Sequence, residues 1–145
     1  MTDTPAGTRN LLCFALYSAN HAMHRLYRPL LAPLGLTYPQ YLVLVSLWAR
    51  DGQRVGDLGQ ELGLETNTLT PLLKRMAESG LVARTRSTED ERVVTVSLTD
   101  KGRAMEPEAA RITACIFEAS GLSVDEIRDL RDRVNALRTR IADDA

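Results

Sequence analysis

Apolar residues recur at three- and four-residue spacing along most of the chain, which is the period of amphipathic helices. The first such pattern runs from about Arg9 to Leu31. A second begins at Thr37, where Thr-Tyr-Pro-Gln has the form of a capping box, and continues as a nearly all-apolar segment that ends near Gly52. Because a helix that is apolar on every side is usually buried, we expect this segment to lie at the centre of the core.

Two shorter helical patterns follow, at residues 54–63 and 66–80, with Gly63-Leu64-Glu65 between them and Gly80 in the position of a C-terminal cap. After Gly80 the apolar period changes to two. This alternation predicts antiparallel strands at 81–84 and 93–98, joined by a polar and charged loop.

The C-terminal third of the sequence is again helical. Thr99 is the expected N-cap of a helix that continues to about Ser120 despite Pro107. Ser123-Val-Asp-Glu126 forms a second capping box, after which one apolar stripe runs along the last helix. The members of this stripe are Val124, Ile127, Leu130, Val134, Leu137 and Ile141. A helix whose other faces are this charged needs an apolar partner for the stripe.

The element order helix, helix, helix, strand, loop, strand within residues 37–98 is that of a winged helix-turn-helix. The predicted fold class is therefore mainly α with a small β-hairpin wing. The flanking helices, at 8–35 and 99–143, are too long for so small a core to cover, so we expect them to be dimerisation helices. The chain would then be one structural domain in a homodimer, with residues 37–98 as its DNA-binding region.

Length and composition agree with a small globular protein. The chain has 145 residues, enough for one domain, and a formal net charge of −1, which by itself does not indicate a nucleic-acid binder. The distribution of charge is more informative, since no acidic residue lies between Asp3 and Asp51. No apolar run approaches the length of a membrane span and the N-terminus has no signal-peptide pattern, so we expect a cytoplasmic protein without membrane partners.

Candidate DNA-contacting residues fall on the helix predicted after Glu65. Its first turns carry small polar side chains that allow close approach to base edges, and two basic residues follow one to two turns later. These residues are Asn67, Thr68, Thr70, Lys74 and Arg75. The alternative is an ordinary amphipathic helix with a solvated face.

The predicted loop favours the DNA-binding interpretation. Arg84 and Arg86 lead into it, and an arginine at a hairpin tip can enter the narrow, negative minor groove. Asp90 and Arg92 stand two apart, so that the carboxylate can orient the guanidinium. The alternative is an exposed salt bridge worth ~0–1 kcal/mol.

Three stretches together resemble the MarR family of winged-helix transcription regulators: LTYPQYLVLVSLW, VGDLGQELGLETNTLTPLLKRMAESGLV and TRSTEDERVVTVSLTDKG. The resemblance covers roughly residues 9–120. Two further stretches, LLCFALYSA and GLTYPQYLVL, are similar to the organic-hydroperoxide-sensing branch, the OhrR-like repressors. The resemblance implies a homodimer that binds an inverted-repeat operator in double-stranded DNA, with one recognition helix in each major groove and the wings in the minor groove.

The same resemblance implies a redox sensor. Cys13 matches the cysteine that an organic hydroperoxide oxidises, after which the dimer leaves DNA. Tyr17, Tyr27 and Tyr38 match the tyrosines that hydrogen-bond the sensing sulfur. Cys115 lies where some members of the branch carry a resolving cysteine, whereas other members use a small external thiol.

The residues themselves are compatible with this role without requiring it. Cys13 stands near a helix start, where terminal N–H groups favour a thiolate, and Arg9 precedes it by one turn. Tyr27 lies some 21 Å from Cys13 along one helix, so it must reach the sulfur from the other subunit or through a fold in the chain. Free cysteines are mostly buried and inert, and the apolar neighbours of Cys115 also suit a plain core position.

The same residues support three other functions less well. His21 and His24 supply only two metal ligands, with no further histidine in the chain, so we expect no metal and no cofactor. One alternative is a MarR-type regulator controlled by a bound aromatic ligand, with Cys13 incidental. Another is a thiol peroxidase, but a helix-turn-helix and wing would have no purpose in it, so we expect no enzyme.

Overall fold

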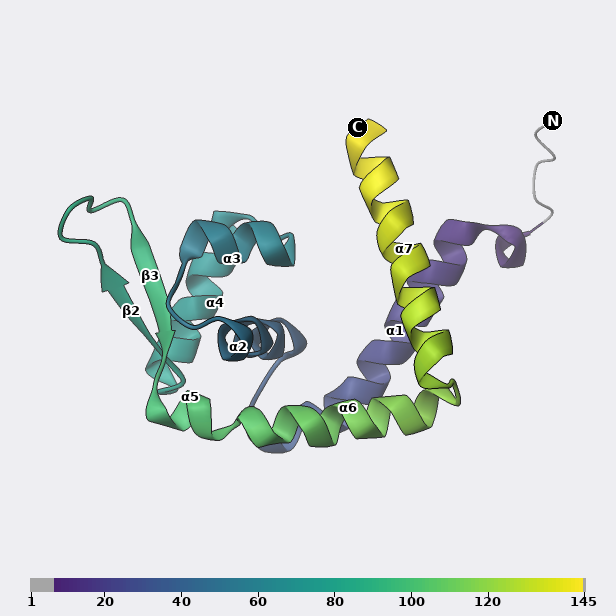
Figure 1. Ribbon diagram of the computed structural model, residues 1–145, viewed down its shortest axis with the longest axis horizontal. Coiled ribbons are helices and arrows are strands. Elements are labelled where there is room, and N and C mark those ends of the chain that lie inside the picture. Colours follow the sequence, from purple (N-terminus) through teal and green to yellow (C-terminus); the bar gives the residue numbers. More distant parts are fainter. Residues whose placement is uncertain (1–6, 145) are drawn as a thin grey trace. The chain divides into compact units, whose positions relative to one another are not determined.

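The computed structural model describes residues 7–144, which divide into two compact units, one through Ile112 and one from Thr113 onward. The first unit contains most of the elements (Figure 1). In chain order the elements are η1 Thr8–Asn10, α1 Leu12–Leu31, η2 Ala32–Leu34, α2 Tyr38–Ala49, β1 Gln53–Arg54, α3 Val55–Leu62, α4 Thr66–Glu78, β2 Val82–Arg86, β3 Val94–Leu98, α5 Asp100–Ala104, α6 Glu106–Ser120 and α7 Val124–Asp144. The mainly α fold with a small β wing that the sequence predicts is confirmed, and α6 passes from the first unit into the second.

The capping box predicted at the start of α2 is present. Thr37 Oγ1 accepts from the Gln40 backbone N–H at 3.4 Å, and Gln40 Oε1 accepts from the Thr37 N–H at 3.1 Å. Downstream, Val43, Leu44 and Leu47 are fully buried. The nearly all-apolar segment is therefore the central core helix, as predicted.

Helices α3 and α4 pack around α2 and close the helix-turn-helix. The fully buried side chains that they contribute are Leu58, Leu69, Leu73 and Met76. Gly63 ends α3 and Gly80 follows α4, both with positive φ, at 67° and 77°. Their left-handed conformation lets the chain reverse after each helix without Cβ strain.

The wing is a three-stranded antiparallel sheet in the order β1-β3-β2, where the sequence predicts two strands. Strands β2 and β3 confirm the hairpin, with Ala83 opposite Ser97. The additional strand, β1, pairs Gln53 with Val96 and Arg54 with Thr95. Two residues are too few to show a periodic pattern, and their pairing partners lie more than forty positions away, so local sequence carries no signal for this strand.

The prediction of one helix from Thr99 to Ser120 is wrong. Thr99 is the N-cap, with Oγ1 accepting from the Gly102 N–H, but α5 ends at Ala104 and α6 begins at Glu106. Pro107 is the reason, because its ring would clash with the Arg103 carbonyl in a continuous helix. As the second residue of α6, Pro107 lacks only an N–H that has no intrahelical acceptor.

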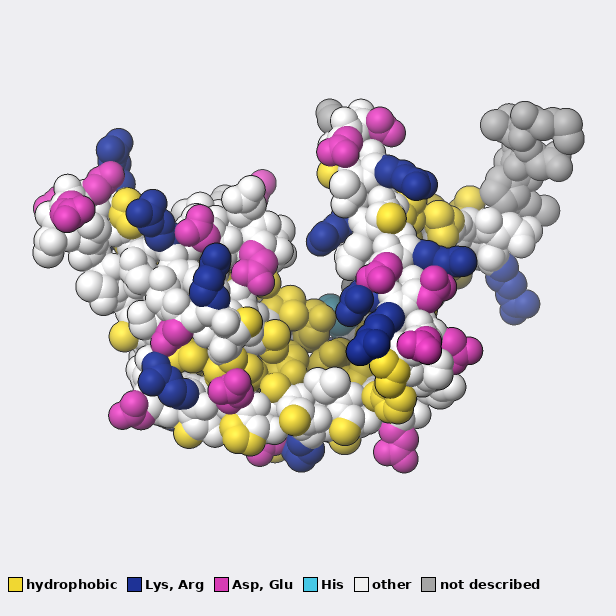
Figure 2. All heavy atoms as spheres, in the orientation of Figure 1, with side chains coloured by type: hydrophobic (Ala, Val, Ile, Leu, Met, Phe, Trp, Pro, Cys, Tyr) yellow, Lys and Arg dark blue, Asp and Glu magenta, His cyan; other side chains and the backbone are white. Residues whose placement is uncertain are grey.

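The second unit consists of the end of α6 and all of α7. The capping box at Ser123 is confirmed, with the Ser123 N–H donating to Glu126 Oε2 at 2.7 Å and the Glu126 N–H donating to Ser123 Oγ at 3.1 Å. Charged side chains of both signs cover much of α7 (Figure 2), and none of its residues is buried. Val124, Leu130 and Ile141 of the apolar stripe are about half exposed or more.

Across residues 7–144, no single helix combines the length and hydrophobicity of a membrane span. Only the pair Leu12–Leu34 and Tyr38–Ala49 reaches that composition jointly, with a 74° bend between its halves, and the second half is the buried core helix α2.

Candidate functional site

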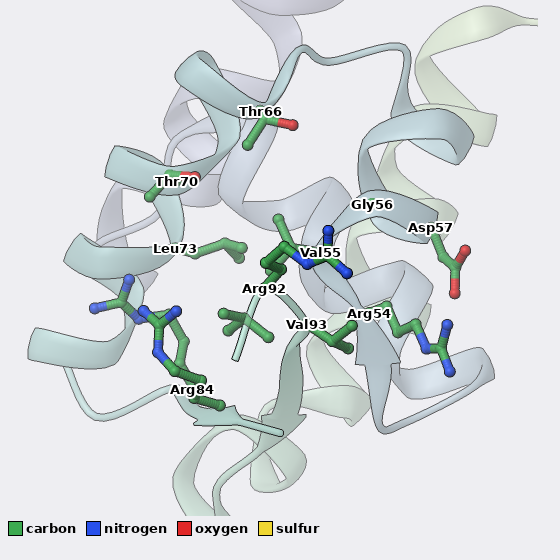
Figure 3. A pocket seen from close by; sticks show the side chains of 12 residues that line it. Arg54, Val55, Gly56, Asp57, Thr66, Thr70, Leu73, Arg84, Arg92 and Val93 are labelled. Carbon is green, nitrogen blue, oxygen red and sulfur yellow. The ribbon is translucent and has the colours of Figure 1, made fainter. Parts of the chain in front are cut away.

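A cleft of about 490 Å³ lies between α3, α4 and the wing. Its lining brings together residues from all three elements, including four arginines. The lining residues are Arg54, Val55, Gly56, Asp57, Thr66, Thr70, Leu73, Arg84, Arg86, Arg92, Val93 and Val94. Figure 3 shows Thr66 and Thr70 on α4 at one side of this cleft and Arg54 and Asp57 at the other.

The first turns of α4 present small polar groups, as the sequence predicts for a recognition helix. Thr66 and Thr70 line the cleft one turn apart. Asn67, Thr68, Lys74 and Arg75 are also exposed but lie outside the cleft lining. The opposite face of α4 packs into the core, so the exposed face is held in a fixed orientation.

The wing tip holds Arg92 through its neighbour Asp90. The Arg92 Nε and Nη2 donate to the two Asp90 carboxylate oxygens at 3.1 and 3.3 Å, and the Arg92 backbone N–H donates to Oδ1 at 3.0 Å. These hydrogen bonds, first of all those from the Arg92 side chain, hold the pKa of Asp90 below its ordinary value. The predicted orienting contact is therefore present, and the Arg92 side chain remains 90% exposed.

Other contacts make the wing loop a defined structure. Ser87 Oγ accepts from the backbone N–H groups of Glu89 and Asp90, both at 3.2 Å. Arg86 Nη1 donates to the carbonyl oxygen of Glu91. Arg84 and Arg86 both line the cleft, so every wing arginine predicted from the sequence faces the same hollow.

Arg54 and Asp57 are part of the cleft, and sequence reasoning missed both. Arg54 is the last residue of β1 and the N-cap position of α3, and it pairs with Thr95 across the sheet. This pairing places it beside the wing, where it also contributes to lowering the pKa of Asp90. The sequence does show a basic residue, Arg54, directly before the short helix α3. Its position beside the wing, however, depends on the pairing of β1 with β3, which the sequence did not predict.

The charge balance of the cleft suits a polyanion. Four arginines line it, and Asp57 is the one carboxylate among its lining residues. Arginine guanidiniums bind phosphate oxygens in bidentate geometry. A recognition helix with small polar residues beside arginines on a wing is the arrangement that reads a major groove and the adjacent minor groove.

Two of the three predicted sensor tyrosines, Tyr27 and Tyr38, meet between α1 and α2, together with His24, which was not predicted to belong to this group. The Tyr27 and Tyr38 ring centroids are 4.9 Å apart, and His24 lies 4.9 Å from Tyr38. All three line a cleft of about 320 Å³. Burial, together with the nearby Tyr38 and Tyr41, raises the pKa of Tyr27 to about 12, and burial also raises the pKa of Tyr38. Both phenols therefore keep their protons and can donate hydrogen bonds.

Cys13 stands apart from this phenol pair. It is exposed and is the second residue of α1, where backbone N–H groups have no helical acceptor. Tyr17, one turn later, is 62% exposed and lies 4.4 Å from His21 between ring centroids. The fourteen positions from Cys13 to Tyr27 span about 21 Å of helix, so the structure does not bring the thiol to Tyr27 within one chain.

Cys115 lies on α6 in the second unit, is partly buried, and is a free thiol like Cys13. No group of three or more metal-ligating side chains occurs in the part of the chain that the structure describes, and His21 and His24 instead contact aromatic rings.

Comparison with known proteins decides the family. Residues 25–107 match the family model described as transcriptional regulator SarA/Rot. The chain is 45% identical to the organic hydroperoxide resistance transcriptional regulator of Bacillus subtilis, covering 90% of this chain and 86% of the relative. The chain belongs to the MarR family of winged-helix transcription regulators. It is also 45% identical to the regulator TtmR of Methylorubrum extorquens, over 96% of this chain and 71% of that protein.

The MarR family assignment also agrees with solved structures of AbfR, a protein of Staphylococcus epidermidis. Reduced AbfR bound to DNA is 34% identical with a TM-score of 0.76, covering 92% of this chain and 94% of AbfR. A disulfide form of AbfR is 35% identical with a TM-score of 0.66 (89% and 90% covered), and an overoxidised form bound to DNA is 32% identical with a TM-score of 0.75 (92% and 93% covered). This MarR-family chain is therefore a DNA-binding transcription regulator and not an enzyme, which excludes the thiol peroxidase alternative.

Proposed function

We propose that the protein is a homodimeric repressor that senses organic hydroperoxides through Cys13 and releases an inverted-repeat operator when Cys13 is oxidised. The observation that supports the proposal most is that the predicted sensor residues lie at opposite ends of α1. An exposed thiol lies at one end of the helix, and a pair of protonated phenols, Tyr27 and Tyr38, lies in a cleft at the other end.

A second copy of the chain would complete this sensor. If α1 of two protomers packs antiparallel, the phenols of the partner approach Cys13 and its neighbour Tyr17. Phenol hydrogen bonds from the partner would stabilise a thiolate. The exposed apolar residues Leu12, Phe14 and Met23 on α1 support such packing, since they otherwise remain in contact with water.

The α7 stripe supports the same oligomeric state. Val124, Leu130 and Ile141 are 49%, 53% and 60% exposed, on a helix whose other faces are charged. Burial of such a stripe against its own copy is the usual stabilising contact of paired helices. We therefore assign residues 8–35 and 99–143 to dimerisation and residues 37–98 to DNA binding.

The proposed reaction consumes one hydroperoxide. The Cys13 thiolate attacks the terminal oxygen of ROOH, the O–O bond breaks, and RO⁻ takes a proton to leave as an alcohol, so that sulfur is oxidised to sulfenic acid. The thiol of Cys115, from the partner subunit, then attacks that sulfur, and a disulfide and water form. An external thiol would give a mixed disulfide in the same way.

Disulfide formation would change DNA binding through geometry. The two recognition helices of a dimer must match half-sites about 34–36 Å apart, so a covalent link that shifts one protomer against the other disturbs both contacts. The relatives support a disulfide as the releasing state, because the B. subtilis relative is an organic hydroperoxide resistance regulator and AbfR is known in a reduced DNA-bound form and in a disulfide form. Overoxidised AbfR is still bound to DNA, so in that relative oxidation without a disulfide does not prevent DNA binding.

The test compares wild type, Cys13→Ser and Cys115→Ser in a gel shift before and after cumene hydroperoxide. The DNA is the duplex that the reduced wild type selects from a random pool, and non-reducing electrophoresis runs alongside. We expect wild type to release DNA and to migrate as a crosslinked dimer, and Cys13→Ser to do neither. Release of DNA by oxidised Cys13→Ser would refute the sensing role. Release without a crosslink would refute the intersubunit disulfide and make Cys115 a plain packing residue.

A second candidate is a regulator whose effector is a small aromatic molecule. The cleft lined by His24, Tyr27 and Tyr38 has room for one ring, and Arg28 is also among its lining residues. In that case Cys13→Ser keeps its full response to the effector and wild type ignores hydroperoxide. The gel shift above, repeated with salicylate in place of hydroperoxide, separates the two.

A further inference from the structure

The start of α5 contacts the end of the recognition helix α4 through three successive carbonyl groups. The Lys101 Nζ donates to the Ser79 carbonyl at 2.8 Å, and the Thr99 hydroxyl donates to the Gly80 carbonyl. The Thr99 backbone N–H donates to the Leu81 carbonyl at 3.1 Å. Ser79, Gly80 and Leu81 are the residues in which the chain leaves α4.

Gly102 allows this approach. A Cβ on Gly102 would overlap the Leu81 carbonyl oxygen, so a side chain at this position would push α5 away from the end of α4. The Gly102 carbonyl in turn accepts from the indole Nε1 of Trp48 at 3.0 Å, which fixes α5 to the core helix α2. We call Thr99, Lys101 and Gly102 the α5 latch.

The other end of α5 is linked to the wing through Asp51, which lies between α2 and β1. Asp51 accepts from the Leu98 N–H at the end of β3 and from the Gly52 N–H, both at 2.8 Å, and from Arg103 Nη2 at 2.9 Å. Partial burial alone would raise the pKa of Asp51, but these donors outweigh it and lower that pKa, so the carboxylate stays ionised. One five-residue helix therefore contacts both DNA-reading elements, the recognition helix and the wing.

We propose that the α5 latch is a positioning device for DNA reading, with Lys101 and Thr99 as positioning residues that set the direction of α4 relative to the wing. Helix α4 has 13 residues and is thus about 20 Å long. A rotation of about 5° around its latched end moves Thr66 and Asn67 by almost 2 Å, which is enough to break a hydrogen bond to a base edge. The latch therefore controls sequence specificity, although none of its residues needs to touch DNA.

The inference goes beyond the proposed function because it concerns the reduced protein and does not involve Cys13. Lys101 is the best probe, since it is exposed and its loss leaves the core intact. The measurement uses full-length protein in dithiothreitol with two fluorescent duplexes, the one that wild type selects from a random pool and a scrambled duplex of the same composition. The ratio of the affinity for the selected duplex to that for the scrambled duplex measures sequence specificity and tests the proposal.

For Lys101→Met we expect this ratio to fall at least about fivefold, the smallest discrimination that one lost base contact gives. Lys101→Arg, which can still donate to the Ser79 carbonyl, should keep the ratio within about twofold. The matched control is Arg128→Met, which removes the same charge from α7 and should leave the ratio unchanged.

Two results would overturn the proposal. Equal weakening on both duplexes would make Lys101 a phosphate contact, because such contacts act on all sequences alike. A melting temperature equal to that of wild type establishes that this weakening is not caused by partial unfolding. An unchanged ratio in Lys101→Met would show that the latch does not position α4.

Discussion

Replacement of Arg54 by alanine tests the cleft as a DNA-binding surface, and it tests the residue that the sequence alone did not single out. Arg54 lines the cleft with Arg84, Arg86 and Arg92, and among the described contacts it forms no ion pair within the protein. Its guanidinium is thus available to a phosphate. We expect Arg54→Ala to weaken binding to all DNA sequences and to reduce the salt dependence of binding.

The magnitude follows from the number of arginines. In the proposed dimer, eight cleft arginines that each neutralise one phosphate give a slope of log K against log salt of about −7. Arg54→Ala removes two of them and brings the slope to about −5. Between 50 and 200 mM salt the wild-type affinity should therefore fall by about four decades and that of the variant by about three.

Fluorescence anisotropy over this salt range, with the duplex that wild type selects, measures both slopes. Arg128→Ala is the control, because it removes an equal charge from α7, far along the sequence from the cleft residues. A variant slope equal to that of wild type would show that Arg54 contacts no phosphate. A change of the same size in Arg128→Ala would show that overall charge, and not the cleft, sets the slope.

Three further predictions follow. Asp90→Asn should weaken specific binding about threefold to tenfold by freeing Arg92, whereas Glu89→Gln, with the same charge change, should not. Because the pKa of Asp90 is lowered, the contact is complete above its ordinary pKa of 3.8 and is lost as pH falls through the lower folded value, which NMR of the Arg92 Nε–H can follow. Thr37→Ala should lower the free energy of unfolding in urea by about 1 kcal/mol through loss of the α2 cap. An ultraviolet titration of wild type minus Tyr27→Phe should show one phenol with a midpoint near pH 12 instead of 10, and the stability that this raised pKa provides is lost as pH rises through that range; a midpoint near 10 would contradict the buried position.

Local chemistry made most of the helices predictable. The capping boxes at Thr37 and Ser123 and the glycines after α3 and α4 act within a few residues, and each lies where the sequence placed it. The change of apolar period after Gly80 likewise located the wing. The Asp90–Arg92 contact was predictable because both partners belong to one turn.

Features that depend on distant residues were not predictable in this way. Strand β1 forms because Gln53 meets Val96 across the sheet, and this pairing carries Arg54 into the cleft. The break at Met105 depends on two energies: the cost of Pro107 within a continuous helix, and the stabilisation that α5 gains from its contacts with distant residues. The meeting of Tyr27 and Tyr38 was expected from family resemblance, since no local pattern relates the last turns of one helix to the start of the next.

The separation of Cys13 from the Tyr27–Tyr38 pair along α1 has a consequence for the living cell. On the proposed arrangement, the thiol and the phenols of a single chain are too far apart to interact. The sensor site forms only when two chains associate. Sensitivity to oxidant would then rise with the concentration of the protein itself. At a low concentration of this regulator few dimers would form, so the cell would lose the response to oxidants together with the control of transcription.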